Sequence, residues 1–289
     1  MESNRWQAGR FSAAASLFCF LSIGCHPESE SSPGATPSAK AGSIERDLLD
    51  LVAAVTPLPA SAPAVDQSDW HIRRQETLER LRAASHAHGL AALALLEEKQ
   101  GSEPEVRADI LDVAAHAAPE ETRDLLVKLV GEYGPAPLLR RRAAELLGDT
   151  LPETALEVLG PILRGEVHGR TLPPEETLLE AWNRAATQLG HDRIPLLCAI
   201  ATDLHREQAV RYLATRLLGE FPSPQGSAAL EQLIVESNGD HLIRRYAAQS
   251  LQKTLAKDEF CARIRAVLEK ETDINFQIFL RDVLDRNCR

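Results

Sequence analysis

The ten residues at 139–148 read Leu-Arg-Arg-Arg-Ala-Ala-Glu-Leu-Leu-Gly, and those at 210–219 read Val-Arg-Tyr-Leu-Ala-Thr-Arg-Leu-Leu-Gly. Both begin with an apolar residue followed by Arg, continue with Ala and Leu at helical spacing, and end with Leu-Leu-Gly. This spacing places the apolar side chains on one face of a helix, and glycine is common where helices end. Each stretch therefore predicts an amphipathic helix.

The apolar–Arg pair that opens these stretches recurs along the chain. Successive copies are 34, 33, 71 and 33 residues apart, and the interval of 71 covers two periods, with the missing copy in 178–190. A last copy without Arg follows after another 33 residues, which makes seven copies. A regular period of this length indicates an array of stacked structural units. The copies begin at Ile72-Arg73, Val106-Arg107, Leu139-Arg140, Leu178, Val210-Arg211, Ile243-Arg244 and Phe276.

A second kind of helix is expected between these copies, for example at 120–133, 153–163 and 228–235. In the first of these, Leu125, Leu126, Leu129 and Val130 share one helical face. Prolines and glycines separate the two kinds of helix, so each repeat is predicted to be a pair of antiparallel helices. One such hairpin cannot cover its own apolar face, and stacking against neighbours would bury it.

The two quoted stretches resemble the V-R-x-x-A-A-x-x-L-G core of HEAT-like (PBS-lyase-type) repeats, and Asp240, before Arg244, matches the acid that precedes the Arg in that family. The resemblance covers 69–289 and implies an all-α fold, a right-handed α-solenoid of about seven HEAT-like helical hairpins. A period near 33 also fits TPR and ankyrin arrays, but their signature residues are missing here. The resemblance predicts architecture far more than function.

The N-terminal residues predict an export signal. Arg5 and Arg10 precede an uncharged stretch, 11–24, which is too short to span a bilayer as a helix but fits the apolar region of a secretory signal. It ends in Leu-Ser-Ile-Gly before Cys25, which resembles a bacterial lipobox. In that family the cysteine carries the lipid and the peptide is cut just before it. We therefore expect 1–24 to be a lipoprotein signal peptide and Cys25 to be the lipidated residue, with an incidental cysteine after an ordinary signal as the alternative.

The next segments predict a spacer between lipid and folded body. Residues 25–43 are rich in Pro, Ser, Glu and Ala and are expected to be a disordered tether. Residues 44–68 hold an amphipathic helix, 44–55, and a Pro-rich linker. That helix can either cap the first repeat or remain detached, and its apolar residues favour capping. The solenoid would then occupy 69–289.

The cysteines predict one disulfide. Cys261 opens one helix of the last predicted hairpin and Cys288 closes the other, so the antiparallel arrangement brings them together. Export would place them in an oxidising compartment, where such a bridge persists. Two unpaired thiols are the alternative. Cys198 lies in an apolar run and is expected to be a small buried residue.

The arginine that recurs at one helical position predicts a ladder between repeats. In this interpretation each guanidinium bonds turn carbonyls and acids of the adjacent repeat; a basic stripe for an anionic ligand is the alternative. The ladder residues are Arg73, Arg107, Arg140, Arg211 and Arg244. His86 and His88, two residues apart, do not share a helical face and lack ligands at metal-binding spacing, so no metal is expected.

Composition and motifs limit the function. The net charge of −10 argues against nucleic acid as a partner, and no phosphate loop, nucleophile elbow or HExxH motif is present in the sequence. We therefore expect a non-catalytic protein-binding scaffold, a monomer without cofactor, that binds an unknown protein or peptide. It would be exported and lipid-anchored through Cys25 to the bacterial cell membrane or outer membrane, facing the periplasm. Alternatives are a lyase-like or other small-ligand-binding HEAT-repeat protein, or a passive structural protein of the envelope.

Overall fold

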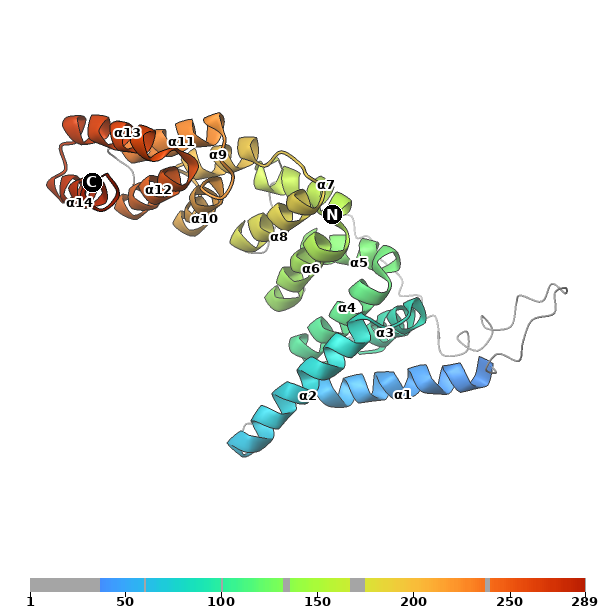
Figure 1. The fold of residues 1–289 in the computed structure, drawn as a ribbon. Coiled ribbons are helices and arrows are strands. Elements are labelled where there is room, and N and C mark those ends of the chain that lie inside the picture. The colour runs from blue at the N-terminus through green and yellow to red at the C-terminus, as the bar shows by residue number, and fades with distance from the viewer. Residues whose placement is uncertain are drawn as a thin grey trace, which may run out of the picture. The chain divides into compact units, whose positions relative to one another are not determined.

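The computed structural model describes residues 37–59, 61–99, 101–131, 136–166, 175–236 and 240–288. The chain divides into two units, 1–40 and 41–289, and every side-chain contact below lies in the second. The described ranges contain fourteen helices and no strand, so the predicted all-α class is confirmed (Figure 1). The helices are α1 (Pro37–Val55), α2 (Ala64–Arg82), α3 (His86–Glu98), α4 (Pro104–Ala117), α5 (Pro119–Gly131), α6 (Pro137–Thr150), α7 (Pro152–Leu163), α8 (Glu175–Gln188), α9 (Ile194–Thr202), α10 (Gln208–Leu218), α11 (Pro224–Val235), α12 (His241–Thr254), α13 (Lys257–Lys270) and α14 (Ile274–Asn287).

Local residues explain where these helices begin and end. Proline opens several of them, because its fixed φ suits the first turn and its missing N–H has no helical partner there. The Asp240 and Asp273 side chains accept hydrogen bonds from the first backbone N–H groups of α12 and α14. After α8, Gly190 has a φ of 64°, and the N–H of His191 donates to the carbonyl of Ala186. This left-handed residue ends the helix at little steric cost.

The helices pack in two alternating series. Chain neighbours pair as α3 with α4, α5 with α6, α7 with α8, α9 with α10, α11 with α12 and α13 with α14. In addition, α2 contacts α4, α4 contacts α6, α6 contacts α8, α8 contacts α10, and α10 contacts α12. We call this series, together with α14, the even helices. All seven sequence copies begin inside an even helix, including the irregular copy in α8.

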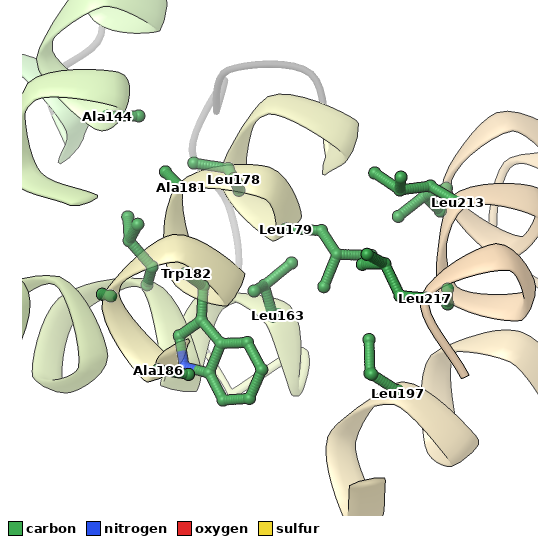
Figure 2. Packing of buried hydrophobic residues seen from close by; sticks show 14 of the residues in the cluster. Ala144, Leu163, Leu178, Leu179, Ala181, Trp182, Ala186, Leu197, Leu213 and Leu217 are labelled. Atoms are coloured by element: carbon green, nitrogen blue, oxygen red, sulfur yellow. The ribbon is translucent and has the colours of Figure 1, made fainter. Parts of the chain in front are cut away.

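The core lies between the two series and consists mainly of Leu, Ala, Val and Ile. Around α8, Leu178 and Ala181 are fully buried and Trp182 is 3% exposed. Figure 2 shows Leu179 of α8 directed toward Leu213 and Leu217 of α10, and Leu163 close by. The copy that lacks Arg is therefore packed as tightly as the regular copies. No helix within the described ranges has the length and apolar character to cross a membrane.

The structure moves two boundaries at the N-terminal side. Helix α1 begins at Pro37, inside the segment predicted to be a disordered tether, and α2 begins at Ala64, inside the predicted linker. Leu51 and Val55 of α1 are buried, and Asp47 bonds Arg80 of α2 at 2.5 Å and His88 of α3 at 3.1 Å. The amphipathic helix therefore contacts α2 and α3, which is the arrangement that its apolar residues predicted.

Candidate binding surface

The even helices are joined by polar side chains that contact the next even helix. Two groups of residues on the even helices include these contacts, and each group is defined here by its residues. The N-terminal row consists of Arg74, Arg82, Asp109, Asp112, Arg142, Glu145, Asp149 and Arg184 on α2, α4, α6 and α8. The C-terminal patch consists of Tyr212, Arg216, Leu242, Arg245, Tyr246, Ile278 and Phe279 on α10, α12 and α14.

Asp112 is the centre of the N-terminal row. Its side chain is only 1% exposed, and its two carboxylate oxygens accept hydrogen bonds from Arg82 of α2 and Arg142 of α6, each at 2.5 Å. One buried carboxylate on α4 therefore joins three consecutive even helices. Burial of a charge is costly unless it is paired, and here both oxygens have charged partners.

The row continues onto α6 and α8 through Glu145. Burial alone would raise the pKa of this carboxyl, but Arg141 and Arg142 outweigh it and hold the pKa below its usual value. The same contacts act on Arg142: burial opposes its charge, yet Asp112 and Glu145 raise its pKa. Arg184 of α8 then donates to the Asp149 carboxylate at 2.6 Å and to the carbonyl of Glu145 at 3.3 Å. The surface of these helices is thus fixed by linked ion pairs.

At the start of the row, Arg74 forms a bidentate pair with Asp109, with both N–O distances 2.6 Å. Burial nevertheless raises the pKa of the Asp109 carboxyl above its usual value, although Arg74 acts in the opposite direction. The Arg74–Asp109 pair therefore orients α2 against α4 but contributes little to the stability of the fold.

The C-terminal patch has a different chemistry. The rings of Tyr212 and Tyr246 meet edge to face with centroids 4.2 Å apart, and the interaction with Tyr246, followed by burial, raises the pKa of the Tyr212 hydroxyl. Arg245 lies over the ring of Phe279, 5.4 Å from its centroid. Tyr246 and Phe279 each follow the first apolar residue of their copy by three positions, as Asp109 and Arg142 do in the N-terminal row. Equal positions on related helices place both groups on the same side of the even helices.

The predicted arginine ladder takes different forms along the chain. In α10 and α12, the Nε atoms of Arg211 and Arg244 donate to the carbonyls of Ala201 and Ile234, which lie near the end of the preceding helix. Arg244 is 1% exposed, also pairs with Glu271 beyond α13, and stacks over Phe276 at 3.8 Å. Arg244 thus contacts both its own hairpin and the following one.

The first three members of the predicted ladder behave differently. Arg73 is exposed and its Nε donates to the carbonyl of Asp69, one turn back in its own helix. Ile72 is 54% exposed, whereas the equivalent Val106 and Leu139 are buried, so the first copy is turned relative to the others. Its neighbour Arg74 faces α4 instead. Arg107 is half-buried in α4 and Arg140 is buried in α6.

The sequence prediction missed the residues that form the N-terminal row. It aligned the copies on the arginine directly after the first apolar residue, but the bonds between even helices come from neighbouring positions. One signal was available: Asp109 and Asp112 are three residues apart inside an apolar helix, and buried acids require partners.

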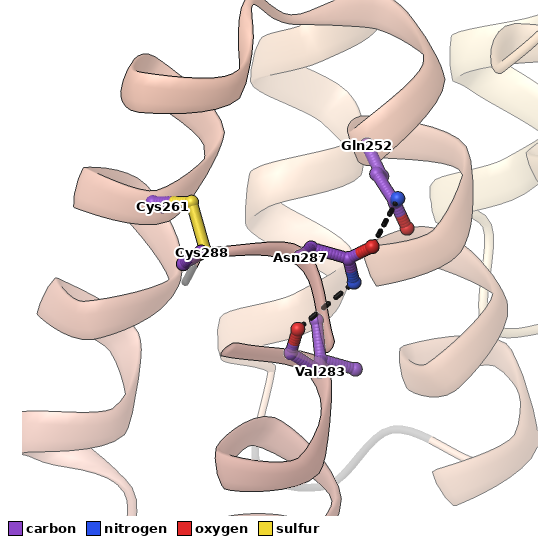
Figure 3. The surroundings of a disulfide bond; sticks show 5 residues. All are labelled: Gln252, Cys261, Val283, Asn287 and Cys288. Atoms are coloured by element: carbon purple, nitrogen blue, oxygen red, sulfur yellow. Dashed lines mark hydrogen bonds between the residues drawn. A yellow bond between two sulfur atoms is a disulfide. The ribbon is translucent and has the colours of Figure 1, made fainter. Parts of the chain in front are cut away.

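The two cysteines predicted to pair do so in the structure. Cys261 and Cys288 form a disulfide, with Cα atoms 5.9 Å apart, which lies in the usual range. Figure 3 shows the bond joining α13 to the end of α14, with Gln252 of α12 donating to Asn287 nearby. The last two helices are therefore held to each other covalently and to α12 by a hydrogen bond. Cys198, expected to be buried, is half-buried, and burial raises the pKa of its thiol.

The histidines near α3 have separate partners. His86 lies 2.6 Å from a carboxylate oxygen of Glu121, and His88 contacts Asp47 and the Ser85 hydroxyl. Within the described ranges, no group of three or more His, Cys, Asp or Glu side chains is arranged to hold a metal ion. The predicted signal peptide and the lipidated Cys25 lie outside the described residues. Comparisons of the chain with protein-family models, with curated proteins and with solved structures returned no match.

Proposed function

We propose that this chain is an exported, lipid-anchored protein whose helices bind a protein or peptide without catalysing a reaction. In this proposal residues 69–289 form a right-handed, HEAT-like α-solenoid of about seven hairpins. The alternating contacts of the even helices support it, because each hairpin buries its apolar face against the next one along the chain. The recurrence of the seven copies inside even helices supports it as well.

One observation carries the binding role: a row of linked ion pairs runs over α2, α4, α6 and α8 and is followed on the same side by an aromatic and basic patch on α10, α12 and α14. Side chains fixed by neighbours lose little freedom when a partner binds, which favours affinity. Tyrosine and arginine are also the residues most often responsible for binding energy at interfaces.

The envelope location is proposed from the lipobox-like sequence before Cys25. A lipid on that residue would attach the chain to a membrane surface, and the following residues would separate the helices from the lipid headgroups. The proposal gives the protein one membrane attachment and a partner in the same compartment.

Crosslinking in the native envelope tests the function. A photoreactive amino acid would replace Arg141 of α6 or Gln249 of α12, both exposed on even helices, and Arg265 of α13 would serve as the control position. A C-terminal tag would recover the products for mass spectrometry. One partner, captured in high yield from α6 and α12 but not from Arg265, is the expected result.

Two other outcomes would overturn the proposal. Equal capture of many proteins from all three positions would indicate nonspecific contact. Recovery of lipidated protein without any partner would point to a passive structural role in the envelope.

A further inference from the structure

The C-terminal patch differs from the N-terminal row in having cations without carboxylate partners. Arg74, Arg82, Arg142 and Arg184 of the N-terminal row each bond an aspartate on a neighbouring even helix. By contrast, Arg216 of α10 and Arg245 of α12 are exposed and form no ion pair with any carboxylate in the part of the chain that the structure describes. Their charges are therefore available to a ligand.

This local excess of positive charge stands in a chain with a net charge of −10. The acidic surface would repel an anionic partner, so such a partner is directed toward exposed cations such as Arg216 and Arg245. Two cations are too few to bind a nucleic acid against such a charge. A short acidic peptide segment matches the charge and the size of the patch.

The patch also offers an apolar contact. Leu242 of α12 and Ile278 of α14 are 46% and 58% exposed, and they line a hollow of about 550 Å³. Arg245 lines the same hollow, together with Asn275, His241 and Asp240, and the Asp240 carboxylate already accepts hydrogen bonds from the Leu242 N–H and the Gln208 side chain. An apolar side chain seated there would contact both Leu242 and Ile278 while a neighbouring carboxylate reached Arg245.

The remaining surface of the patch is aromatic. Tyr212 and Arg216 are one helical turn apart on α10, and Tyr246 packs against Tyr212. Packed helices are separated by about 8–10 Å, so α10 to α14 spans roughly 20 Å, the length of about six extended residues. A single peptide can therefore contact all three helices.

We propose that the C-terminal patch binds an acidic peptide segment that carries an apolar side chain. Its carboxylates pair with Arg216 and Arg245, its backbone crosses the Tyr212–Tyr246 pair, and its apolar side chain enters the hollow beside Leu242 and Ile278. The inference rests on the proposed binding function and specifies the chemistry of the partner at this part of the surface.

The test is selection of peptides on the purified full chain from a displayed library of random twelve-residue peptides, followed by fluorescence anisotropy of the selected peptides. We expect selected peptides to have a net negative charge and at least one large apolar residue, and to bind more weakly as salt rises. Arg216→Gln/Arg245→Gln should weaken their binding at least tenfold. The matched control, Arg265→Gln/Lys270→Gln on α13, removes the same charge and should change binding less than twofold.

Three outcomes would overturn the inference. They are failure to select any peptide, selection of neutral or basic peptides, and equal weakening by both double variants. Preferential binding of a synthetic peptide of residues 26–36, which contains Glu28 and Glu30, would instead assign the patch to the chain's own segment. If crosslinking finds an envelope partner while no acidic peptide is selected, the binding function stands and this inference fails. If acidic peptides bind the patch but crosslinking finds no envelope partner, this inference stands and the proposed binding function in the envelope fails.

Discussion

Asp112 shows what a single residue contributes to this structure. Its carboxylate is almost completely buried and binds Arg82 and Arg142 from two different helices. Both arginines are partly exposed, with 30% and 27% of their side chains accessible, so water can reach them if the acid is lost. Loss of the Asp112 carboxylate should therefore lower the free energy of unfolding by less than loss of a fully buried ion pair and by more than loss of a surface ion pair.

We expect Asp112→Asn to destabilise the fold by about 2–3 kcal/mol, because a neutral amide cannot satisfy two guanidinium groups. Urea unfolding followed by circular dichroism measures the change. The matched control is Asp149→Asn, where Arg184 and Asp149 are 40% and 37% exposed, and a loss below about 1 kcal/mol is expected there. Equal losses in the two variants would contradict the central role assigned to Asp112.

The carboxyl groups also set the pH dependence of stability. Burial would raise the pKa of Glu145, but Arg141 and Arg142 hold it below its ordinary value. Burial would likewise raise the pKa of Glu271, but the backbone N–H of Asp273 and the Arg244 side chain hold it below its ordinary value. Between the folded and unfolded pKa values the unfolded chain binds more protons. The stabilisation is thus fully present above the unfolded value and is lost as pH falls through the folded one. Asp109 has a raised pKa and acts in the opposite direction.

The midpoint of urea unfolding should accordingly be lower at about pH 3 than at about pH 6, because the stabilisation is lost between the unfolded and the folded pKa values. The decrease should be smaller in Glu145→Gln, which has no carboxyl to protonate at that position. Glu97→Gln, at an exposed glutamate of α3, is the control and should show the decrease of the unmodified chain. An undiminished decrease in Glu145→Gln would show that this carboxyl does not contribute to the acid sensitivity.

At the scale of the helices, small residues decide how closely neighbours approach. The glycine that ends the motif Leu-Leu-Gly lies against the next even helix in both quoted stretches. A Cβ on Gly148 would lie 2.5 Å from the carbonyl oxygen of Ala181 in α8, and one on Gly219 would lie 2.7 Å from the Cβ of Ser250 in α12. The glycine of the motif is therefore required for the close approach of neighbouring even helices, in addition to its role in ending a helix.

Gly148→Ala should destabilise the fold by about 1–3 kcal/mol, since α6 and α8 would have to move apart. The direction of the change is informative, because a Gly→Ala substitution in an exposed helix stabilises the fold by about 1 kcal/mol, the opposite of the effect expected here. Gly101→Ala is the control: nothing lies within 4 Å of the added Cβ, so a change within about 0.5 kcal/mol is expected. Thermal unfolding of the three proteins compares them, and a stabilised Gly148→Ala would refute the close approach.

The sequence predicted features that are determined within one helix or one hairpin, and it missed features that depend on how neighbouring helices pack. The all-α class and the positions of the even helices were predictable, because apolar spacing, prolines and capping acids act within each helix. The Cys261–Cys288 pair was predictable because antiparallel helices bring their opposite ends together. The N-terminal row was not, since its bonds come from positions other than the aligned arginine: Arg73 bonds its own helix, whereas Arg74 contacts Asp109 of α4. Which position faces the next even helix depends on packing between helices.

For the whole molecule, the lipid on Cys25 is expected to determine where the protein resides. Cys25→Ser removes the only proposed site of lipidation, so the protein should move from the membrane fraction to the soluble fraction of the envelope, or remain unprocessed. Immunoblotting after fractionation measures this. Cys198→Ser, at a half-buried cysteine of α9, is the control and should remain with the membrane. An unchanged distribution of Cys25→Ser would disprove the anchor.

The disulfide at the C-terminal end provides a test of how stability is distributed along the chain. Cys261 and Cys288 are 27 residues apart in the sequence. In the chain-entropy description, closing a loop of this length adds about 3 kcal/mol to the free energy of unfolding. In the stacked array that we propose, each hairpin is stabilised by its neighbours only, so the loss should remain near the end where the bond is removed. Cys261→Ala/Cys288→Ser should therefore accelerate amide hydrogen exchange in α13 and α14 and leave α4 to α6 unchanged. Labelling of the unmodified protein with a thiol reagent, with and without reductant, first establishes that the bond is formed. Faster exchange throughout the chain would mean that the helices unfold as one cooperative unit, and the nearest-neighbour description of this protein would then be wrong.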